Sequence, residues 1–254
     1  MYLYIYDSSL QDKKYAKLLS KIEARLTDLD IKGKIVRLSL LRNIGETIKD
    51  ALRQGVHTII AVGTDKTLTQ IVNSLQDFSV TLGFIPMTTD SALARILGIP
   101  PYELACEVIA NRLLQTIDLG KINNTYFLLN VSVEQGEVVV SSNDKYTVAA
   151  TTPQQTVRIA NLGYGSGGSV YDPQDGKLEA VFEERGGSSF GPFNRFFGQK
   201  EVRPSIIPMR KIKLTHTDES LPIVVDGQQV VKTPATIEVM PKQLKVIVGK
   251  ERLF

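Results

Sequence analysis

The sequence has a single cysteine, Cys106, so no disulfide can form within the chain. No apolar run approaches the roughly 20 residues that a membrane-spanning helix needs. The apolar stretch at the start of the chain is too short for a secretory signal and lacks a basic segment before it. The formal net charge is only +3, which gives no electrostatic argument for binding nucleic acid. We therefore expect a cytoplasmic protein without a nucleic-acid partner.

Apolar residues are plentiful enough to form a core. The chain has 254 residues, of which 43% are hydrophobic, and this size suits one large or two modest domains. In the first half, apolar runs alternate with apolar residues at helical spacing. Strands are expected at residues 2–6, 35–38, 58–62 and 80–85, and helices at 18–29, 44–52, 68–75, 91–97 and 102–116. This alternation predicts a Rossmann-like α/β domain, in which helices cover both faces of a parallel sheet.

The pattern changes near residue 117. From Tyr126 onward, short β-type segments alternate with turn signals such as Asp175-Gly176 and Asp226-Gly227. This pattern predicts an all-β domain built as a sandwich or an open barrel. We therefore assign residues 1–119 to the α/β domain and residues 120–254 to a β-sandwich domain.

The segment after the third expected strand, Gly63-Thr64-Asp65-Lys66-Thr67, has features of a phosphate-binding loop. Ligands of parallel sheets lie beyond the carboxyl ends of the strands, where a helix N-terminus offers free amides and a positive dipole end. Gly63 permits the turn, and the two threonines supply hydroxyl groups. Lys66 can neutralise phosphate, and Asp65 can orient a ribose or a magnesium-bound water. An ordinary strand-to-helix connection, with Asp65 or Thr67 as the N-cap, is the alternative.

A second polar loop, Thr88-Thr89-Asp90-Ser91, follows the fourth expected strand. It should lie beside the first loop, because the carboxyl ends of parallel strands meet at one edge of the sheet. Asp90 or Ser91 also fits as the N-cap of the next helix. Two polar loops at neighbouring strand ends favour a ligand crevice, so Thr88 and Thr89 join residues 63–67 as candidate nucleotide contacts.

Five blocks of the sequence resemble the diacylglycerol kinase-like lipid kinases. Residues 60–73 are similar to the family's Gly-Gly-Asp-Gly-Thr-Leu loop and the helix after it, and residues 82–100 to its Leu-Gly-Ile-Ile-Pro block. Residues 117–123 match the family's domain junction. Residues 161–181 resemble its Gly-Gly and Asp-Gly-x-Leu-Asp block, and residues 224–248 its Asp-Gly-Glu block and closing hairpin. The resemblance covers nearly the whole chain in the correct order.

This resemblance implies a nucleotide-binding domain, a β-sandwich domain on the lipid side, and a site in the cleft between them. Members of the family transfer the γ-phosphoryl group of ATP to a lipid hydroxyl, so ATP and Mg²⁺ are the expected cofactors. Asp172, Asp175 and Glu179 match an acidic turn that can hold a structural magnesium ion in the family. A solvated acidic turn is the alternative interpretation.

Several family positions differ in this sequence. The second and third glycines of the phosphate loop are Thr64 and Lys66, which lack the backbone freedom of glycine. Gln228 replaces the glutamate that the resemblance identifies as the general base, and loss of a general base costs about 10²–10⁴ in rate. Asp226 is the remaining carboxylate in that block. Asp226 and Asp65 are therefore the candidate catalytic residues.

Three functions stay open. The chain fits an ATP-dependent lipid kinase with a remodelled site, an inactive nucleotide- or lipid-binding relative, or a kinase of a soluble small molecule, as in the NAD kinase branch. The expected partners are a nucleotide and a lipid or membrane surface, and a homodimer is also open. The candidates for membrane contact, which could instead pack into the cleft, are Phe190, Phe193, Phe196 and Phe197 with Arg195 and Lys200.

Overall fold

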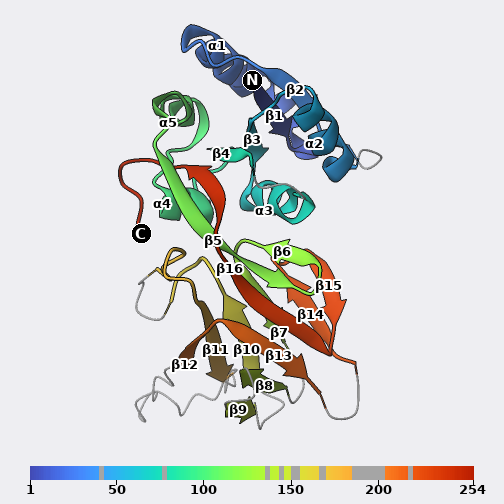
Figure 1. The fold of residues 1–254 in the computed structure, drawn as a ribbon. Helices are drawn as coiled ribbons and strands as arrows, with labels where there is room; N and C mark the ends of the chain where they lie inside the picture. The colour runs from blue at the N-terminus through green and yellow to red at the C-terminus, as the bar shows by residue number, and fades with distance from the viewer. Residues whose placement is uncertain are drawn as a thin grey trace, which may run out of the picture.

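The computed structural model of the chain has an α/β half, at the top of Figure 1, and a β half below it. The structure describes residues 1–39, 43–75, 79–134, 138–142, 146–149, 155–165, 170–184, 204–216 and 220–254. The phenylalanine-rich segment proposed for membrane contact, residues 190–200, lies outside the described residues.

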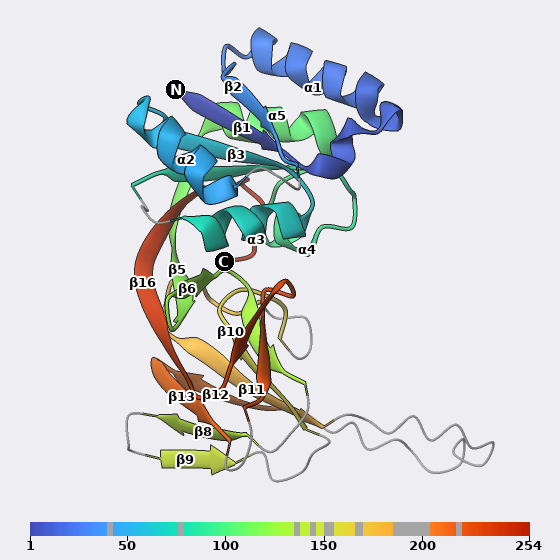
Figure 2. The ribbon, with the colours of Figure 1, turned by 90° about the vertical axis from the view of Figure 1, so that its right-hand side faces the viewer.

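A parallel sheet forms the centre of the α/β half, as the sequence predicts. Its strand order is β2-β1-β3-β4, and the strands are β1 (Tyr2–Tyr6), β2 (Lys34–Arg37), β3 (Thr58–Gly63) and β4 (Thr81–Pro86). Every residue of β3 and β4 is buried, which explains why both strands read as unbroken apolar runs. Helices cover both faces of the sheet (Figure 2). One face carries α1 (Ala16–Asp28) and α5 (Ala105–Asn111), and the other carries α2 (Ile44–Arg53) and α3 (Asp65–Ser74).

Short helical segments complete this half. They are the 3₁₀ turns Ser8–Gln11, Lys13–Tyr15 and Tyr102–Leu104, and the helix α4 (Ala92–Leu97). The helix predicted over 102–116 ends earlier, at Asn111, because Arg112 adopts a left-handed backbone conformation with φ of 50°. The next strand then begins at Leu114, where pairing with the C-terminal strand takes precedence over the local helical pattern.

The β half contains a six-stranded antiparallel sheet in the order β12-β11-β10-β7-β14-β15. The first sheet continues beyond β4 through β16, β13, β8 and β9. The six-stranded sheet packs against this continuation, and a separate apolar core that includes Phe127, Ile159 and Ile237 fills the space between the two sheets. The predicted all-β sandwich is confirmed. Its strands are β5 (Leu114–Ile122), β6 (Thr125–Phe127), β7 (Asn130–Val133), β8 (Val139–Ser142), β9 (Tyr146–Ala149), β10 (Gln155–Ala160), β11 (Leu178–Glu184), β12 (Ser205–Met209), β13 (Lys211–Thr215), β14 (Pro222–Val225), β15 (Gln229–Lys232) and β16 (Ala235–Ile247).

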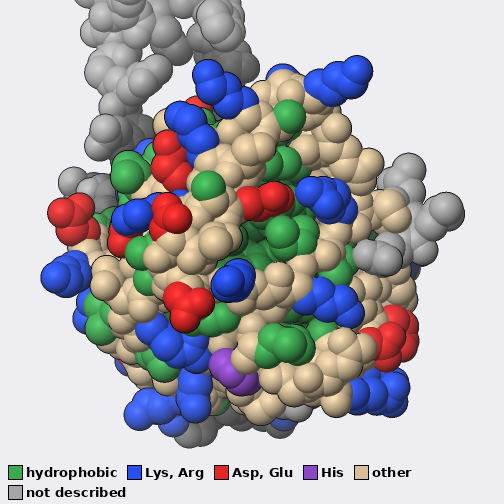
Figure 3. All heavy atoms as spheres, turned by 90° about the horizontal axis from the view of Figure 1, so that it is seen from above, with side chains coloured by type: hydrophobic (Ala, Val, Ile, Leu, Met, Phe, Trp, Pro, Cys, Tyr) green, Lys and Arg blue, Asp and Glu red, His purple; other side chains and the backbone are tan. Residues whose placement is uncertain are grey.

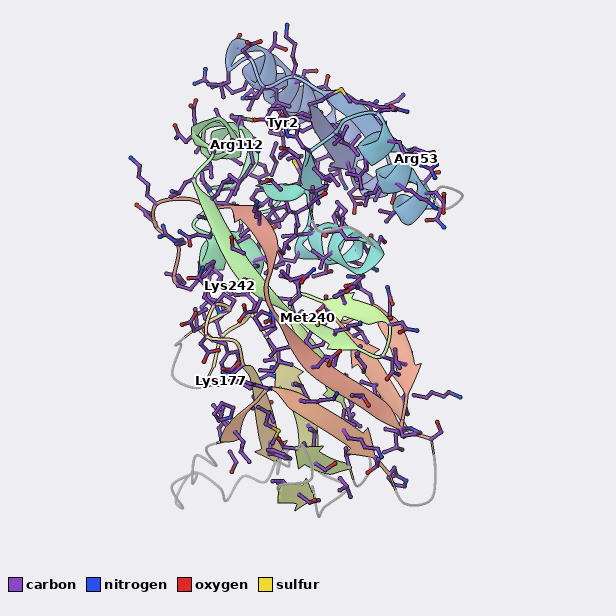
Figure 4. All side chains as sticks on the ribbon, in the orientation of Figure 1. Tyr2, Arg53, Arg112, Lys177, Met240 and Lys242 are labelled. Carbon is purple, nitrogen blue, oxygen red and sulfur yellow. The ribbon has the colours of Figure 1, made fainter. Side chains whose placement is uncertain are left out.

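Strand β16 connects the two halves (Figures 1 and 2). Its first part pairs with β13 and β5, and its last part pairs in parallel with β4 of the α/β sheet. The register shifts between Met240 and Leu244, near Lys242, and Figure 4 labels Met240 and Lys242 at this crossing. Residues 244 and 246–248 belong to the α/β core although they lie near the end of the chain. The division at residue 119 stays a prediction.

Asp118, in the expected domain junction, fixes this crossing. The residue is fully buried, and its carboxylate accepts N–H bonds from Lys242 at 2.7 Å and Gly176 at 2.8 Å. Its own N–H donates to the carbonyl of Pro173 at 2.6 Å. A buried carboxylate supplied with backbone donors is well stabilised, so Asp118 joins three segments at the boundary between the two halves.

Cys106 is buried in α5. Burial raises the pKa of its thiol to about 11, which disfavours the reactive thiolate. Among the described residues, no helix has the length and apolar character to cross a membrane.

Candidate functional site

Gly63 ends β3 in a space that admits no side chain. A Cβ atom at this position would lie 2.3 Å from Thr67 Oγ1 and 2.9 Å from the Cβ of Asp7. The glycine is therefore needed for close packing between the ends of β1 and β3 and the start of α3. Its carbonyl oxygen also accepts the N–H of Met87 at 2.7 Å, which holds the loop after β4 beside the loop after β3.

Asp7 follows β1 and organises the candidate phosphate loop. Thr67 Oγ1 donates to Asp7 Oδ2 at 2.6 Å and accepts the N–H of Thr64 at 3.1 Å. Asp7 Oδ1 accepts the N–H and the hydroxyl of Ser9, at 2.9 and 2.7 Å. Burial alone would raise the pKa of Asp7, but the hydrogen bonds from Thr67 and Ser9 and the charge of Lys66 hold it below its usual value. The carboxylate is thus charged at neutral pH.

Asp7 was not among the residues expected in the site. The strand expected at residues 2–6 ends at Tyr6 in the same parallel sheet as the third strand, so Asp7 could have been placed at the edge that carries the phosphate loop. Its hydrogen bond to Thr67, sixty residues away, had no local signal.

The N-terminus of α3 presents free backbone donors. The N–H groups of Thr67 and Leu68 bond to the carbonyl of Thr64, at 2.9 and 3.2 Å. The N–H groups of Asp65 and Lys66, the first two residues of the helix, have no acceptor among the described residues. The side chains of Thr64 and Lys66 are exposed at the same point. Two free amides, a helix dipole and an ammonium group together favour an anion.

Asp65 turns its carboxylate toward α4. Its Oδ1 accepts the hydroxyl of Ser91, and its Oδ2 accepts the N–H groups of Ala92 at 3.0 Å and Leu93 at 3.2 Å. Ser91 in turn caps α4 by accepting the N–H of Ala94 at 2.8 Å. The contacts of Asp65 therefore join the two polar loops, and its role toward ribose or magnesium stays a prediction.

Thr88 and Thr89 lie in the second polar loop, which the structure places beside the first. Thr88 Oγ1 accepts the N–H of Asp90 at 3.2 Å, while the Thr89 side chain is exposed. Ser91, rather than Asp90, is the N-cap of α4. The candidate nucleotide contacts at 63–67 and 88–89 thus lie at the carboxyl edge of the parallel sheet, and their contact with nucleotide stays a prediction.

Gln228 reaches this edge from the β half. It lies in the β14–β15 turn, and its Nε2 donates to the carbonyl of Lys66 at 3.2 Å and to Thr69 Oγ1. Its Oε1 is buried and has no hydrogen-bond partner. The side chain is therefore held against the first turn of α3, and its bond to the Lys66 carbonyl needs a donor that a carboxylate could not supply.

Asp226 lies two residues earlier in a backbone conformation with φ of 48°. Its carboxylate is buried and accepts the N–H groups of Leu128 at 2.9 Å, Leu129 at 2.9 Å and Asn130 at 3.0 Å. These three donors lie at the junction between β6 and β7. Burial raises the pKa of Asp226 to about 6, although the three N–H bonds oppose this shift.

The surroundings of Asp226 favour a structural role. The amide of Asn73 in α3, oriented to satisfy its neighbours, donates to Asp226 Oδ2 at 3.2 Å and to the carbonyl of Tyr126 at 2.8 Å. With four donors around two oxygens, little acceptor capacity is left for a substrate proton. The catalytic role assigned to Asp226 stays a prediction without support from these contacts.

The acidic turn lies apart from the phosphate loop, beside the domain junction. Asp172 Oδ1 accepts the N–H of Gln174 at 2.9 Å, and Asp175 forms an ion pair with Lys177 at 3.2 Å. Burial, with smaller effects from Asp175 and Asp172, raises the pKa of Glu179 to about 7. Among the described residues, no three acidic, histidine or cysteine side chains are close enough together to hold a metal ion. The magnesium role of Asp172, Asp175 and Glu179 therefore stays a prediction.

The chain is similar to proteins of one known family. Residues 2–122 match the diacylglycerol kinase catalytic domain. A candidate lipid kinase of Staphylococcus haemolyticus is 26% identical over 272 residues, which cover 86% of this chain and 87% of the relative. A candidate lipid kinase from Staphylococcus aureus strain JH9 is 26% identical over 269 residues, which cover 84% of this chain and 87% of that relative. The likeness to lipid kinases of this family, expected from the sequence, is confirmed and includes both halves.

Solved structures show the same fold. A diacylglycerol kinase from Bacillus anthracis superposes with a TM-score of 0.77 at 20% identity, covering 99% of this chain and 97% of that one. An NAD kinase from Archaeoglobus fulgidus, solved in complex with ATP, gives a TM-score of 0.66 at 15% identity. The superposition covers 100% of this chain and 96% of that one. The two-domain architecture is therefore the one found in diacylglycerol and NAD kinases.

Proposed function

We propose that the chain binds ATP at the N-terminus of α3 and transfers its γ-phosphoryl group to a lipid hydroxyl, at a rate lowered by the absence of a carboxylate at residue 228. The observation that carries the proposal is the pair of free N–H groups of Asp65 and Lys66 at the carboxyl edge of the parallel sheet. Similarity to the diacylglycerol kinase catalytic domain and to lipid kinases supports the acceptor class.

The residues around the loop supply binding and charge rather than proton transfer. The free amides and the Lys66 ammonium would hold phosphate oxygens, and Asp7 with Thr67 would keep the loop in shape. In the transfer, the bond between the γ-phosphorus and its bridging oxygen breaks to leave ADP. A new bond forms to the lipid oxygen, whose proton goes to solvent. Phosphoryl transfer depends mainly on positioning and charge stabilisation, so turnover without a general base is slow but feasible.

Magnesium would be bound chiefly by the nucleotide phosphates, as is usual for this ion. Bound there, it would neutralise charge on the transferred phosphoryl group.

A nucleotide- or lipid-binding protein without turnover is the second candidate. It is favoured by the occupied carboxylate of Asp226 and by the amide of Gln228, which donates to α3 instead of accepting a proton. A kinase of a soluble acceptor such as NAD has support at the level of the fold alone.

The test separates binding from turnover. Thermal unfolding would be followed with ATP, ADP and GTP, each with and without Mg²⁺, in the parent, Lys66→Gln and the surface control Lys49→Gln. We expect ATP to raise the melting temperature of the parent and the control more than that of Lys66→Gln. Absence of a shift with every nucleotide would overturn the proposal.

Turnover is then measured as transfer of labelled γ-phosphate to diacylglycerol and other lipid alcohols in mixed micelles, and to NAD. Slow labelling of a lipid supports the proposal. Nucleotide binding without labelling of any acceptor supports the second candidate, and labelling of NAD alone supports the third.

A further inference from the structure

A cavity of about 1060 Å³ lies in the α/β half, between the ends of α4 and α5, the start of β5 and the C-terminal segment. This volume suits a site for a small molecule. The lining is largely apolar. Its hydrophobic members include Ile99, Pro100, Val108, Leu113, Leu114 and Leu253.

The cavity is separate from the candidate nucleotide site. It shares no lining residue with the loops at 63–67 and 87–91. Arg112, one of its lining residues, donates to Thr58 Oγ1 at 3.1 Å, and Thr58 is the first residue of β3, whereas Gly63 is the last. A strand of this length spans roughly 20 Å, so this wall of the cavity lies at the opposite edge of the sheet.

Two glycines allow the backbone to build the cavity wall. A Cβ at Gly249 would lie 1.7 Å from the carbonyl oxygen of Gly98, and one at Gly98 would lie 2.5 Å from the nitrogen of Arg252. The N–H of Gly249 donates to the carbonyl oxygen of Leu97 at 2.8 Å, and the N–H of Leu253 donates to the carbonyl oxygen of Ile96 at 2.9 Å. The C-terminal segment is thus fixed against α4 and forms a stable wall.

Positive charge lines the apolar space. The lining includes three cationic side chains, Arg95, Arg112 and Lys250, and one carboxylate, that of Glu251. Arg95 and Lys250 are exposed, and neither forms an ion pair with a carboxylate in the part of the chain that the structure describes. Seen from above, the α/β half carries basic side chains beside exposed hydrophobic ones (Figure 3). Unpaired cations beside exposed leucines suit a ligand that is anionic at one end and apolar at the other.

We propose that this cavity binds one molecule of an anionic amphiphile, a phosphate monoester of a long-chain alcohol. The excess of two positive charges in the lining matches a phosphate dianion, which Arg95 and Lys250 would contact. The hydrocarbon chain would lie along Leu113, Leu114 and Leu253, of which 37%, 41% and 48% are exposed. The proposal does not depend on the kinase activity, because the site shares no residue with the phosphate loop.

Isothermal titration calorimetry tests the proposal with three probes. They are dodecyl phosphate below its micelle concentration, dodecylphosphocholine with the same chain but no net charge, and inorganic phosphate. We expect dodecyl phosphate to bind at least about tenfold more tightly than either of the others, the factor that loss of one charged hydrogen bond gives. Comparable binding of dodecylphosphocholine, or no binding of dodecyl phosphate, would overturn the proposal.

Variants locate the site. Arg95→Gln with Lys250→Gln should weaken dodecyl phosphate binding about tenfold or more, and Leu253→Ser should weaken it through the chain. The matched control, Lys49→Gln with Arg53→Gln on the surface of α2, should leave it unchanged. Melting temperatures would verify that all variants fold. Equal affinity in the parent and the Arg95/Lys250 variant, or hydrogen-exchange protection confined to the loops at 63–67 and 87–91, would place the ligand elsewhere and overturn the proposal.

Discussion

The side-chain amide of Gln228 donates to the carbonyl oxygen of Lys66 at 3.2 Å and so ties the β14–β15 turn to the first turn of α3. This bond joins the two halves at the edge where the candidate phosphate loop lies. At the position where the resemblance expects a general base, the chain therefore carries a hydrogen-bond donor that contacts the helix.

Replacing Gln228 tests whether this contact limits catalysis. In Gln228→Glu a carboxylate would face the Lys66 carbonyl without a proton to donate, so we expect a loss of about 1–3 kcal/mol in unfolding free energy at pH 8. Lipid phosphorylation should nevertheless become faster, because a base is restored. Urea unfolding and labelled-phosphate transfer measure the two effects. Gln228→Ala is the control, since it loses the contact without gaining a base; equal turnover in the two variants would contradict the prediction.

Gly63 offers a test of the loop geometry. Gly63→Ala places a methyl group within 2.3 Å of Thr67 Oγ1, so the loop must shift and the bond from Thr67 to Asp7 must change. We expect a loss of about 1–3 kcal/mol in stability and weaker ATP binding, measured by unfolding and calorimetry. The control, Gly45→Ala in α2, meets no atom closer than 3.3 Å and should be neutral or stabilising. Unchanged ATP affinity in Gly63→Ala would show that the loop does not contact the nucleotide.

Asp226→Asn distinguishes a structural carboxylate from a catalytic one. Asparagine keeps one acceptor oxygen, so its NH₂ group would face backbone N–H donors of residues 128–130. We expect a loss of about 1–3 kcal/mol for each amide left without an acceptor, measured by chemical unfolding. The exposed control Asp90→Asn should change stability by less than about 0.5 kcal/mol. A variant of parental stability that has lost its turnover would instead support Asp226 as a catalytic residue.

Glu179 should make stability depend on pH. Burial raises its pKa from 4.5 to about 7, so the stability that this group contributes is full below about pH 4.5 and is lost as the pH rises through 7. In Glu179→Gln the side chain is neutral at every pH, so the variant does not lose this stability as the pH rises. We expect the variant to be more stable than the parent at pH 8 and nearly equal to it at pH 5, as measured by urea unfolding at both values. The exposed control Glu46→Gln should follow the parent, and a Glu179→Gln variant that gains nothing at pH 8 would contradict the shift.

Much of the α/β half could be predicted because its signals are local. Runs such as Ile59–Val62 are apolar without interruption when both faces of a strand are covered, and α1 repeats Leu19, Ile22 and Leu26 at helical spacing. The same logic placed the loops after β3 and β4 at one edge. It failed at the end of α5, where pairing with β16 decides the structure of residues that look helical.

Sequence alone established the order of strands and helices, the polar loops at their ends and the likeness to lipid kinases. Tertiary structure alone decided what the candidate side chains contact: Asp65 bonds to amides 27 and 28 residues away, Asp226 to amides 96–98 residues away, and Gln228 to a carbonyl 162 residues away. It also decided that β16 returns to the first sheet. The physical reason is that periodicity reports which face of an element is buried, whereas a hydrogen-bond partner depends on how distant segments meet.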